Sequence, residues 1–300
     1  DDNRTFMKFT VDKTLVYFIS MEGTNRVVRN YCLLMVSLME SYLKNMLQKL
    51  DKEEVMRRIL LNQLGELELQ EVVRDYKLDL GLPRCVYIIR TVGMEADNVY
   101  HMLLKAFPRN HGDILVLVDS MTVSLVKAVP KELDEDDLTQ LASAMDESIQ
   151  NETSNKPYIG IGKVKENLFQ LQESYDEATK AIEVGKIYNT SNRVYMYSTL
   201  LLERFLYEVP VNLCETYSKL LFTKEYKKLL SDEMIRTINN FFENSLNLSE
   251  TARQLFIHRN TLVYRLDKVQ RIMGLDLRNF HDAVTFKIMM MLMDRYAWEA

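Results

Sequence analysis

The sequence predicts an α+β multidomain protein with three parts. An N-terminal hairpin is followed by long helices, a middle part alternates strands with helices, and the C-terminal part is all helical. The prediction rests on apolar residues that recur every second position in some stretches and every third or fourth in others. It also rests on two helix patterns near the C-terminus that are separated by a tight corner. The chain has 300 residues, which is long enough for two or three domains.

Composition and the length of the apolar runs argue against a membrane-spanning or secreted protein. The hydrophobic share of 47% and the charged share of 27% are typical of a globular protein with a sizeable core. The longest apolar run, residues 31–39, is too short to span a bilayer, and no signal peptide is present, so we expect a cytoplasmic protein without a membrane partner. The chain begins with Asp1 rather than Met, and we therefore expect further sequence on its N-terminal side.

Cysteine and histidine usage argues against metal sites. The three cysteines, Cys32, Cys85 and Cys214, lie far apart in apolar surroundings, which favours buried thiols in a reducing compartment. No CxxC motif occurs and the four histidines are scattered. We expect no metal, no cofactor and no catalytic residues.

The N-terminal part, residues 1–50, contains two strand-like runs at 5–11 and 14–19, with a tight turn at Asp12-Lys13. Because an isolated hairpin is unstable in water, it either ends a larger domain or pairs with another copy. A long helix over 24–50 has more apolar residues than one face needs. This favours a dimerising or interdomain helix, and packing within its own domain remains the alternative.

Residues 51–82 are expected to form a helical linker. Asp51 and Glu54 make a capping box for a helix that extends to about Leu64. A further helix over 68–76 ends before Gly81-Leu82-Pro83.

The middle part, residues 83–198, has the order βαββαβαβ, which predicts a sheet with helices on one face. Gly160-Ile161-Gly162 is a weak candidate for a phosphate loop because it lacks a third glycine and a following Lys-Ser/Thr. A strand end with close packing is the preferred interpretation.

Residues 199–300 are expected to be helical, with an interruption at Pro210. Asn247 followed by Glu250 starts the first helix of a helix-turn-helix, and Gly274 suits the C-terminal end of the second. The second helix has an apolar face made of Leu262, Leu266, Val269 and Met273. A last, methionine-rich helix after Asn279 is expected to pack under this motif.

A basic island coincides with the helix-turn-helix. Residues 249–278 contain six Lys or Arg and three Asp or Glu, a net charge of +3, while the whole chain carries −5. Amide, hydroxyl, phenol and cationic groups on the outer face of the second helix suit contacts with base edges and phosphates. The predicted DNA-binding residues are Thr251, His258, Arg259, Asn260, Thr261, Tyr264, Arg265, Lys268 and Arg271. Two alternatives stay open: His258 caps the helix, and Arg265 forms an ion pair with Asp267 or Glu250.

The string His258-Arg259-Asn260-Thr261-Leu262-x-Tyr264-Arg265-Leu266, followed by Gly274-Leu275-Asp276-Leu277, resembles the DNA-binding domain of PucR/CdaR-like bacterial transcriptional regulators. The middle part resembles the GGDEF-like α/β sandwich that precedes it in the CdaR type. The resemblance covers roughly residues 60–297. It implies a homo-oligomeric regulator that binds double-stranded DNA, responds to a small-molecule effector, and carries an N-terminal sensor of which residues 1–50 are the last piece.

The hairpin at 118–122 departs from the pattern of an active diguanylate cyclase. It consists of Val118-Asp119-Ser120-Met121-Thr122, without the glycines that let phosphate approach or the paired acids that bind Mg²⁺. We therefore expect a scaffold or interaction module and not an enzyme. A nucleotide-binding or cyclase-like enzyme on the middle domain is the alternative, and a basic helix that binds protein is a third. The leading hypothesis is a sequence-specific transcriptional regulator that acts as a homodimer.

Overall fold

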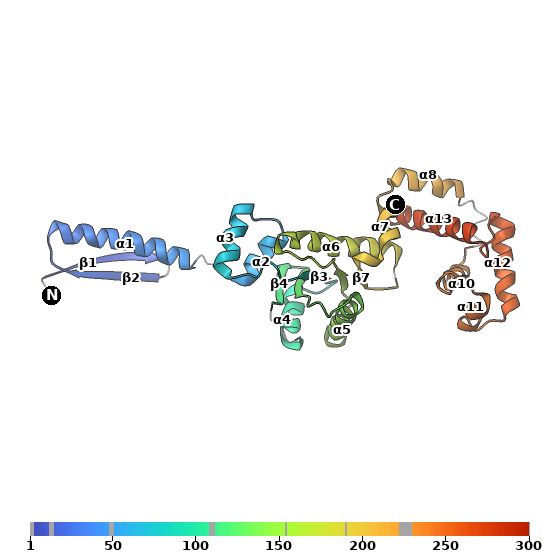
Figure 1. The fold of residues 1–300 in the computed structure, drawn as a ribbon, viewed down its shortest axis with the longest axis horizontal. Helices are drawn as coiled ribbons and strands as arrows, with labels where there is room; N and C mark the ends of the chain where they lie inside the picture. Colours follow the sequence, from blue (N-terminus) through green and yellow to red (C-terminus); the bar gives the residue numbers. More distant parts are fainter. Residues whose placement is uncertain are drawn as a thin grey trace.

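The computed structural model describes residues 3–11, 15–47, 51–107, 112–153, 155–189, 191–221 and 230–299. Three units follow one another along its longest axis (Figure 1). The first is a hairpin covered by one helix, the second is a sheet between helices, and the third is all helical. The middle part is thus a layered α/β unit, and the helix-turn-helix lies in the third unit.

In the first unit, β1 (Arg4–Val11) and β2 (Leu15–Glu22) pair antiparallel, and α1 (Arg26–Leu47) lies against them. Phe9 of the hairpin and Cys32 of the helix are buried between the two layers. The turn expected at Asp12-Lys13 lies outside the described residues. None of the helices in the described part of the chain combines the length and the apolar character that a membrane crossing requires.

The first helix after this unit belongs to the sheet core. Asp51 accepts a hydrogen bond from the Glu54 amide at 2.7 Å, as the capping box predicted, and starts α2 (Lys52–Leu60). Val55 and Met56 of α2 are completely buried in the core that the helix shares with β4. This part of the segment expected to be a linker is therefore a packed element, and α3 (Glu66–Tyr76) follows it.

The central sheet has five strands in the order β4-β5-β3-β6-β7. All neighbours are antiparallel except β6 and β7, which are parallel. The strands are β3 (Arg84–Arg90), β4 (Ile114–Asp119), β5 (Thr122–Ala128), β6 (Tyr158–Ile161) and β7 (Val194–Met196).

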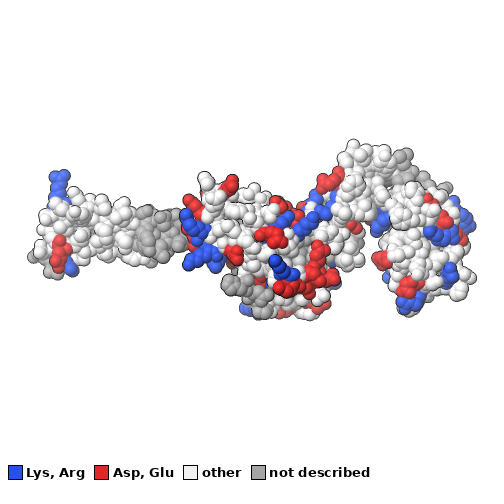
Figure 2. Space-filling model, viewed as in Figure 1, with Lys and Arg blue, Asp and Glu red and all other residues white. Residues whose placement is uncertain are grey.

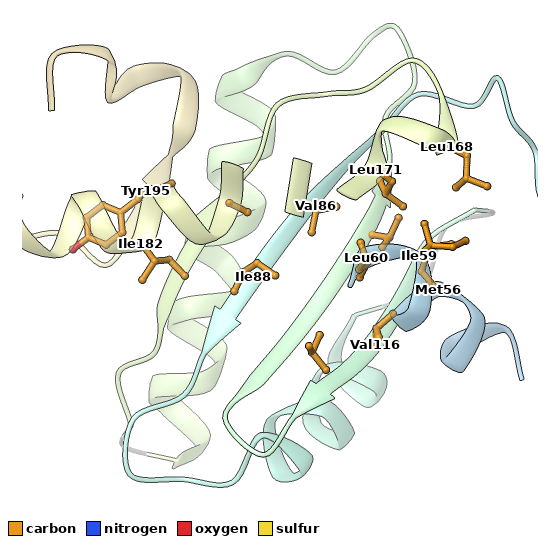
Figure 3. Packing of buried hydrophobic residues seen from close by; sticks show 14 of the residues in the cluster. Met56, Ile59, Leu60, Val86, Ile88, Val116, Leu168, Leu171, Ile182 and Tyr195 are labelled. Atoms are coloured by element: carbon orange, nitrogen blue, oxygen red, sulfur yellow. The ribbon is translucent and has the colours of Figure 1, made fainter. Parts of the chain in front are cut away.

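Helices cover both faces of the sheet, so the prediction of helices on one face is wrong. α4 (Ala96–Ala106) and α5 (Glu135–Thr153) lie on one face, and α2 and α6 (Leu171–Tyr188) lie on the other (Figure 1). Along β3, Val86 and Ile88 point to the α2 and α6 side, where they meet Met56, Leu171 and Ile182 (Figure 3). The alternate residues Tyr87 and Ile89 point to α4 and α5. An unbroken run of buried apolar residues is the signature of a strand covered on both faces.

Gly160 of β6 and Gly162, which follows it, allow α6 to approach the sheet closely. A Cβ atom at Gly160 would lie 2.0 Å from the Ala178 carbonyl oxygen, and one at Gly162 would lie 2.1 Å from the Ser174 carbonyl oxygen. The backbone of these glycines is covered by a helix. The interpretation of Gly160-Ile161-Gly162 as a close-packed strand end is therefore confirmed, and the phosphate-loop interpretation is not.

The third unit begins with α7 (Leu201–Tyr207) and α8 (Val211–Leu221), which are separated at Pro210 as predicted. α10 (Asp232–Glu243) precedes the helix-turn-helix, which consists of α11 (Leu248–Gln254) and α12 (Arg259–Met273), and α13 (Phe280–Glu299) follows it. α13 contributes Phe286 to the core of the helix-turn-helix, and it also packs against α8, α7 and α6. It therefore connects the helix-turn-helix to the middle unit, a role the sequence did not indicate.

Candidate nucleic-acid interface

The second helix of the motif, α12, is positioned by its apolar face. Leu262, Leu266 and Val269 are completely buried against Ile238 and Phe241 of α10. Gly274 ends the helix in the left-handed conformation at φ 75°, and its amide donates to the Gln270 carbonyl at 2.9 Å. Because one face of α12 is held in the core, its other face is turned to solvent.

The corner between α11 and α12 is a closed hydrogen-bonded turn. The Ile257 amide donates to the Ala252 carbonyl at 3.0 Å, and the Phe256 amide donates to the Arg253 carbonyl at 3.2 Å. This pair of bonds is a Schellman motif, whose left-handed position is usually glycine. Here that position is Phe256 at φ 53°. The motif satisfies the last carbonyls of α11 and reverses the chain into α12.

His258 caps α12. Its Nδ1 atom accepts a hydrogen bond from the Asn260 amide at 3.2 Å, which satisfies one free donor of the first turn. The capping alternative is thus confirmed. The cap fixes the direction in which the following residues leave the corner.

Six of the nine predicted DNA-binding residues lie on the exposed surface around α12. They are His258, Arg259, Asn260, Thr261, Tyr264 and Arg271. Lys268 is half-buried, and the Arg271 guanidinium carbon lies 6.0 Å from the centre of the Tyr264 ring. The structure therefore brings an amide, two hydroxyls, an imidazole and three cations onto one helix and its cap.

Thr251 and Arg265 are placed differently from the prediction. Thr251 is completely buried, and its hydroxyl donates to the Asn247 carbonyl at 2.7 Å, so it is not available to DNA. Arg265 is directed towards α10, where it pairs with Glu233 and donates to the Thr237 hydroxyl at 2.7 Å. It is a structural ion pair, as the alternative proposed, but its partner comes from α10 and not from Asp267 or Glu250.

Most acids near the helix-turn-helix are already paired. Arg253 lies 2.6 Å from Glu250, and its hydrogen bond lowers the pKa of that carboxyl. Arg278 lies 2.9 Å from Asp267 and 2.7 Å from Asp276, and its hydrogen bonds lower the pKa of Asp276. The three carboxylates are therefore engaged with Arg253 and Arg278 and not with the cations of the outer face.

Three of the six cations of the basic island are not paired with an acid of the described residues. Within the described residues, Arg259, Lys268 and Arg271 have no acidic partner within ion-pair distance. Lys and Arg side chains are visible on the part of the molecule that carries α11 and α12 (Figure 2). The net charge of the basic island is thus concentrated on α12, where it is available to a polyanion.

Phe256 was missed by the sequence reasoning. It is 96% exposed, although it is a large aromatic residue, and it lies in the corner directly before the cap of α12. The sequence could have predicted its exposure, because a phenylalanine in a turn between two amphipathic helices has no apolar face on which to pack. An exposed aromatic beside a basic helix can stack on sugars or bases, or contact a thymine methyl group.

The middle unit shows no catalytic arrangement among the described residues. In the β4–β5 hairpin the Asp119 carboxylate accepts from the Met121 amide at 2.8 Å, so it closes the turn. No group of three or more His, Cys, Asp or Glu that could hold a metal ion occurs in the described ranges.

Comparison with known families gives two matches. Residues 234–292 match the PucR C-terminal helix-turn-helix domain, and residues 62–184 match the GGDEF-like domain. The first match contains α11, α12 and most of α10 and α13, and the second contains α3, the strands β3 to β6 and most of α6, but not β7.

Curated relatives carry the same description. The proline-responsive transcriptional activator PutR of Bacillus subtilis (strain 168) is 32% identical over 46% of this chain and 34% of its own. The purine catabolism regulatory protein of the same organism is 26% identical over 40% of this chain and 23% of its own. The carbohydrate diacid regulator of Escherichia coli (strain K12) is 25% identical over 80% of this chain and 65% of its own. All three relatives are named as regulators, and this chain spans less than two thirds of the length of each.

Proposed function

Because the chain belongs to the PucR/CdaR-like transcriptional regulators, we propose that it recognises a specific operator in double-stranded DNA through the outer face of α12. The observation that carries the proposal is the set of three cations, Arg259, Lys268 and Arg271, on the exposed side of a helix that is otherwise held in a core. In this arrangement the first turn of α12 enters the major groove. Asn260 and Arg259 are placed to contact base edges there, and Lys268 and Arg271 are placed to contact phosphates.

Fluorescence anisotropy with labelled duplex DNA from the promoter region next to the gene tests this function. We expect saturable binding that weakens linearly on a log–log plot as salt increases, because phosphate contacts release counterions. Unlabelled promoter duplex should compete better than a shuffled duplex of equal length. Binding that is independent of salt would contradict the proposed phosphate contacts. Equal competition by both duplexes would contradict sequence-specific recognition. Loss of all DNA binding would favour the alternative in which the basic helix binds a protein.

Phe256 extends the proposed interface at the corner. We expect Phe256→Ala and Phe256→Gly to weaken operator binding to a similar extent, because each removes the exposed ring. Their stabilities should differ, since a left-handed residue with a Cβ atom costs about 1 kcal/mol more than glycine. Phe256→Gly is therefore expected to raise the free energy of unfolding relative to Phe256→Ala.

Thermal unfolding and anisotropy on the same preparations measure both effects of these two variants. Wild-type affinity in both variants would show that Phe256 does not contact DNA. It would not contradict the proposed contacts of α12.

We also propose that the chain acts as a homodimer, so that two recognition helices meet two half-sites. An exposed stripe on α1 supports this assembly. Val27, Tyr31, Leu34 and Leu38 are each between 58% and 61% exposed and follow the spacing 4, 3, 4 of a coiled-coil seam. Cys32, on another side of the same helix, is buried against the hairpin. A second copy of α1 fits this seam, because it presents apolar residues at the same 4, 3, 4 spacing.

Two adjacent leucines on α1 provide a matched test of the dimer. Leu34 lies on the seam, whereas Leu33 is 55% exposed and lies away from it. We expect Leu34→Lys to weaken the dimer by about 3 kcal/mol or more, because two leucines lose their burial. Leu33→Lys, which introduces the same charge one residue away, should leave the dimer intact.

Sedimentation velocity at several concentrations measures the dissociation constant of each variant. Equal behaviour of the two variants would place the dimer interface elsewhere.

We propose that a small molecule in the cytoplasm controls the DNA-binding activity. One relative is named as proline-responsive and another for carbohydrate diacids, so these two relatives are named for different small molecules.

A further inference from the structure

A cavity lies between α4, α5 and the face of β4 and β5. Its volume is about 580 Å³, which is within the range of small-molecule sites. Its walls are mainly apolar and include Leu103, Leu104, Phe107, Leu133, Leu141 and Met145. It lies at the start of β4 and the end of β5, whereas the hairpin at 119–122 lies at the opposite end of the same two strands. The cavity is therefore separate from the position that a nucleotide occupies in a cyclase of this fold.

The polar side chains that line the cavity are Asp137, Gln140 and a buried ion pair of Asp113 with Lys127. The Lys127 ammonium lies 2.8 Å from Asp113 Oδ2, and the two side chains are 8% and 6% exposed. Asp113 Oδ1 accepts from the Ala128 amide at 2.9 Å, so both carboxylate oxygens are engaged. An ammonium group has three N–H donors, and among the described residues Lys127 donates to Asp113. Lys127 thus retains donor capacity for an acceptor inside the cavity.

The charge of the ligand follows from the charge of the pair. Among the described residues that line the cavity, Asp113 neutralises Lys127, and Asp137 at the edge adds one negative charge. A carboxylate ligand would gain attraction from Lys127 but lose it to the two acids, and it would also lose its hydration. An ammonium ligand would meet Lys127 at close range. An uncharged acceptor loses the least hydration and still satisfies the ammonium.

We propose that this cavity is a binding site for an uncharged amphipathic molecule, with an aliphatic body against the leucines and a carbonyl oxygen that accepts from Lys127 Nζ. The proposal rests on the proposed function, because it offers a location for the small-molecule response. It is tested without DNA, so its failure would leave operator binding untouched.

Three six-carbon probes with the same body test the assignment: hexanamide, hexanoate and hexylamine. Met145 lines the cavity and is 1% exposed, so its ¹³C-labelled methyl group reports binding at this location by NMR. Its signal is assigned with Met145→Leu. We expect a saturable shift with hexanamide and a dissociation constant at least about threefold lower than for either charged probe. No saturable shift with any probe, or tighter binding of a charged probe, would overturn the proposal.

Two variants identify the polar contact. Lys127→Met should weaken hexanamide binding about fivefold, the usual size of one hydrogen bond. Lys105→Met, which removes an exposed lysine of α4 outside the cavity, should have no effect. If Lys127→Met does not fold, Ala144→Phe fills the cavity and keeps the ion pair, and it should abolish the shift. Wild-type affinity in Lys127→Met, or in Ala144→Phe, would exclude the site.

Discussion

The double variant Arg259→Ala plus Lys268→Ala is expected to lose operator affinity on the order of 100-fold. Each cation has no acidic partner among the described residues, so its charge is available to phosphate or to a base edge. Removal of two charge-assisted contacts costs about 3 kcal/mol or more, and 1.4 kcal/mol corresponds to a factor of ten. The slope of log affinity against log salt should also decrease, by about 0.9 for each lost phosphate contact. Anisotropy titrations at several salt concentrations measure both quantities.

Two control variants separate the charge effect from folding. Arg74→Ala removes an arginine of α3 whose side chain is 76% exposed, and it should change neither affinity nor salt slope. Arg265→Ala removes the contacts with Glu233 and Thr237 of α10, so it should lower the stability of the helix-turn-helix by about 1 kcal/mol without changing the slope. If Arg265→Ala reduced the salt slope as much as the double variant does, Arg265 would contact phosphate and leave its position on α10.

Local rules predicted the recognition helix well. The cap at His258, the left-handed end at Gly274 and the buried Leu262 each follow from a few neighbouring residues. The same rules gave the break at Pro210 and the cap at Asp51. These features depend on capping hydrogen bonds, on the restricted backbone of proline and glycine, and on apolar spacing along one helix, all of which can be read from neighbouring residues.

Features that depend on packing between distant segments were not predictable. The partner of Arg265 is Glu233, which is 32 residues away on another helix, and only the crossing of α10 and α12 brings the two together. Thr251 is polar and was assigned to the surface, but its hydroxyl bonds to its own helix, which allows the residue to be buried. The double-sided cover of the sheet was different, because the apolar run of β3 already indicated it and was not used.

The largest expected effect on stability comes from the middle unit, at Gly160. A methyl group there would lie 2.0 Å from the Ala178 carbonyl oxygen and 2.9 Å from a side-chain carbon of Ile182, so α6 would have to move away from β6. Because α6 carries Ile182 and Ala178 in the core against the sheet, this displacement opens the packing of the whole face. We expect Gly160→Ala to destabilise the protein by at least about 3 kcal/mol, at the upper end of overpacking effects.

Gly81→Ala is the matched control for Gly160→Ala. Its new methyl group would meet Asp79 at 3.9 Å, an ordinary contact, so it should change the free energy of unfolding by less than about 1 kcal/mol. Urea denaturation followed by circular dichroism measures the two variants against wild type. Equal midpoints would mean that α6 does not approach β6 as closely as the structure places it. A large loss in Gly160→Ala alone would confirm that Gly160 is needed for the close approach of α6 to β6.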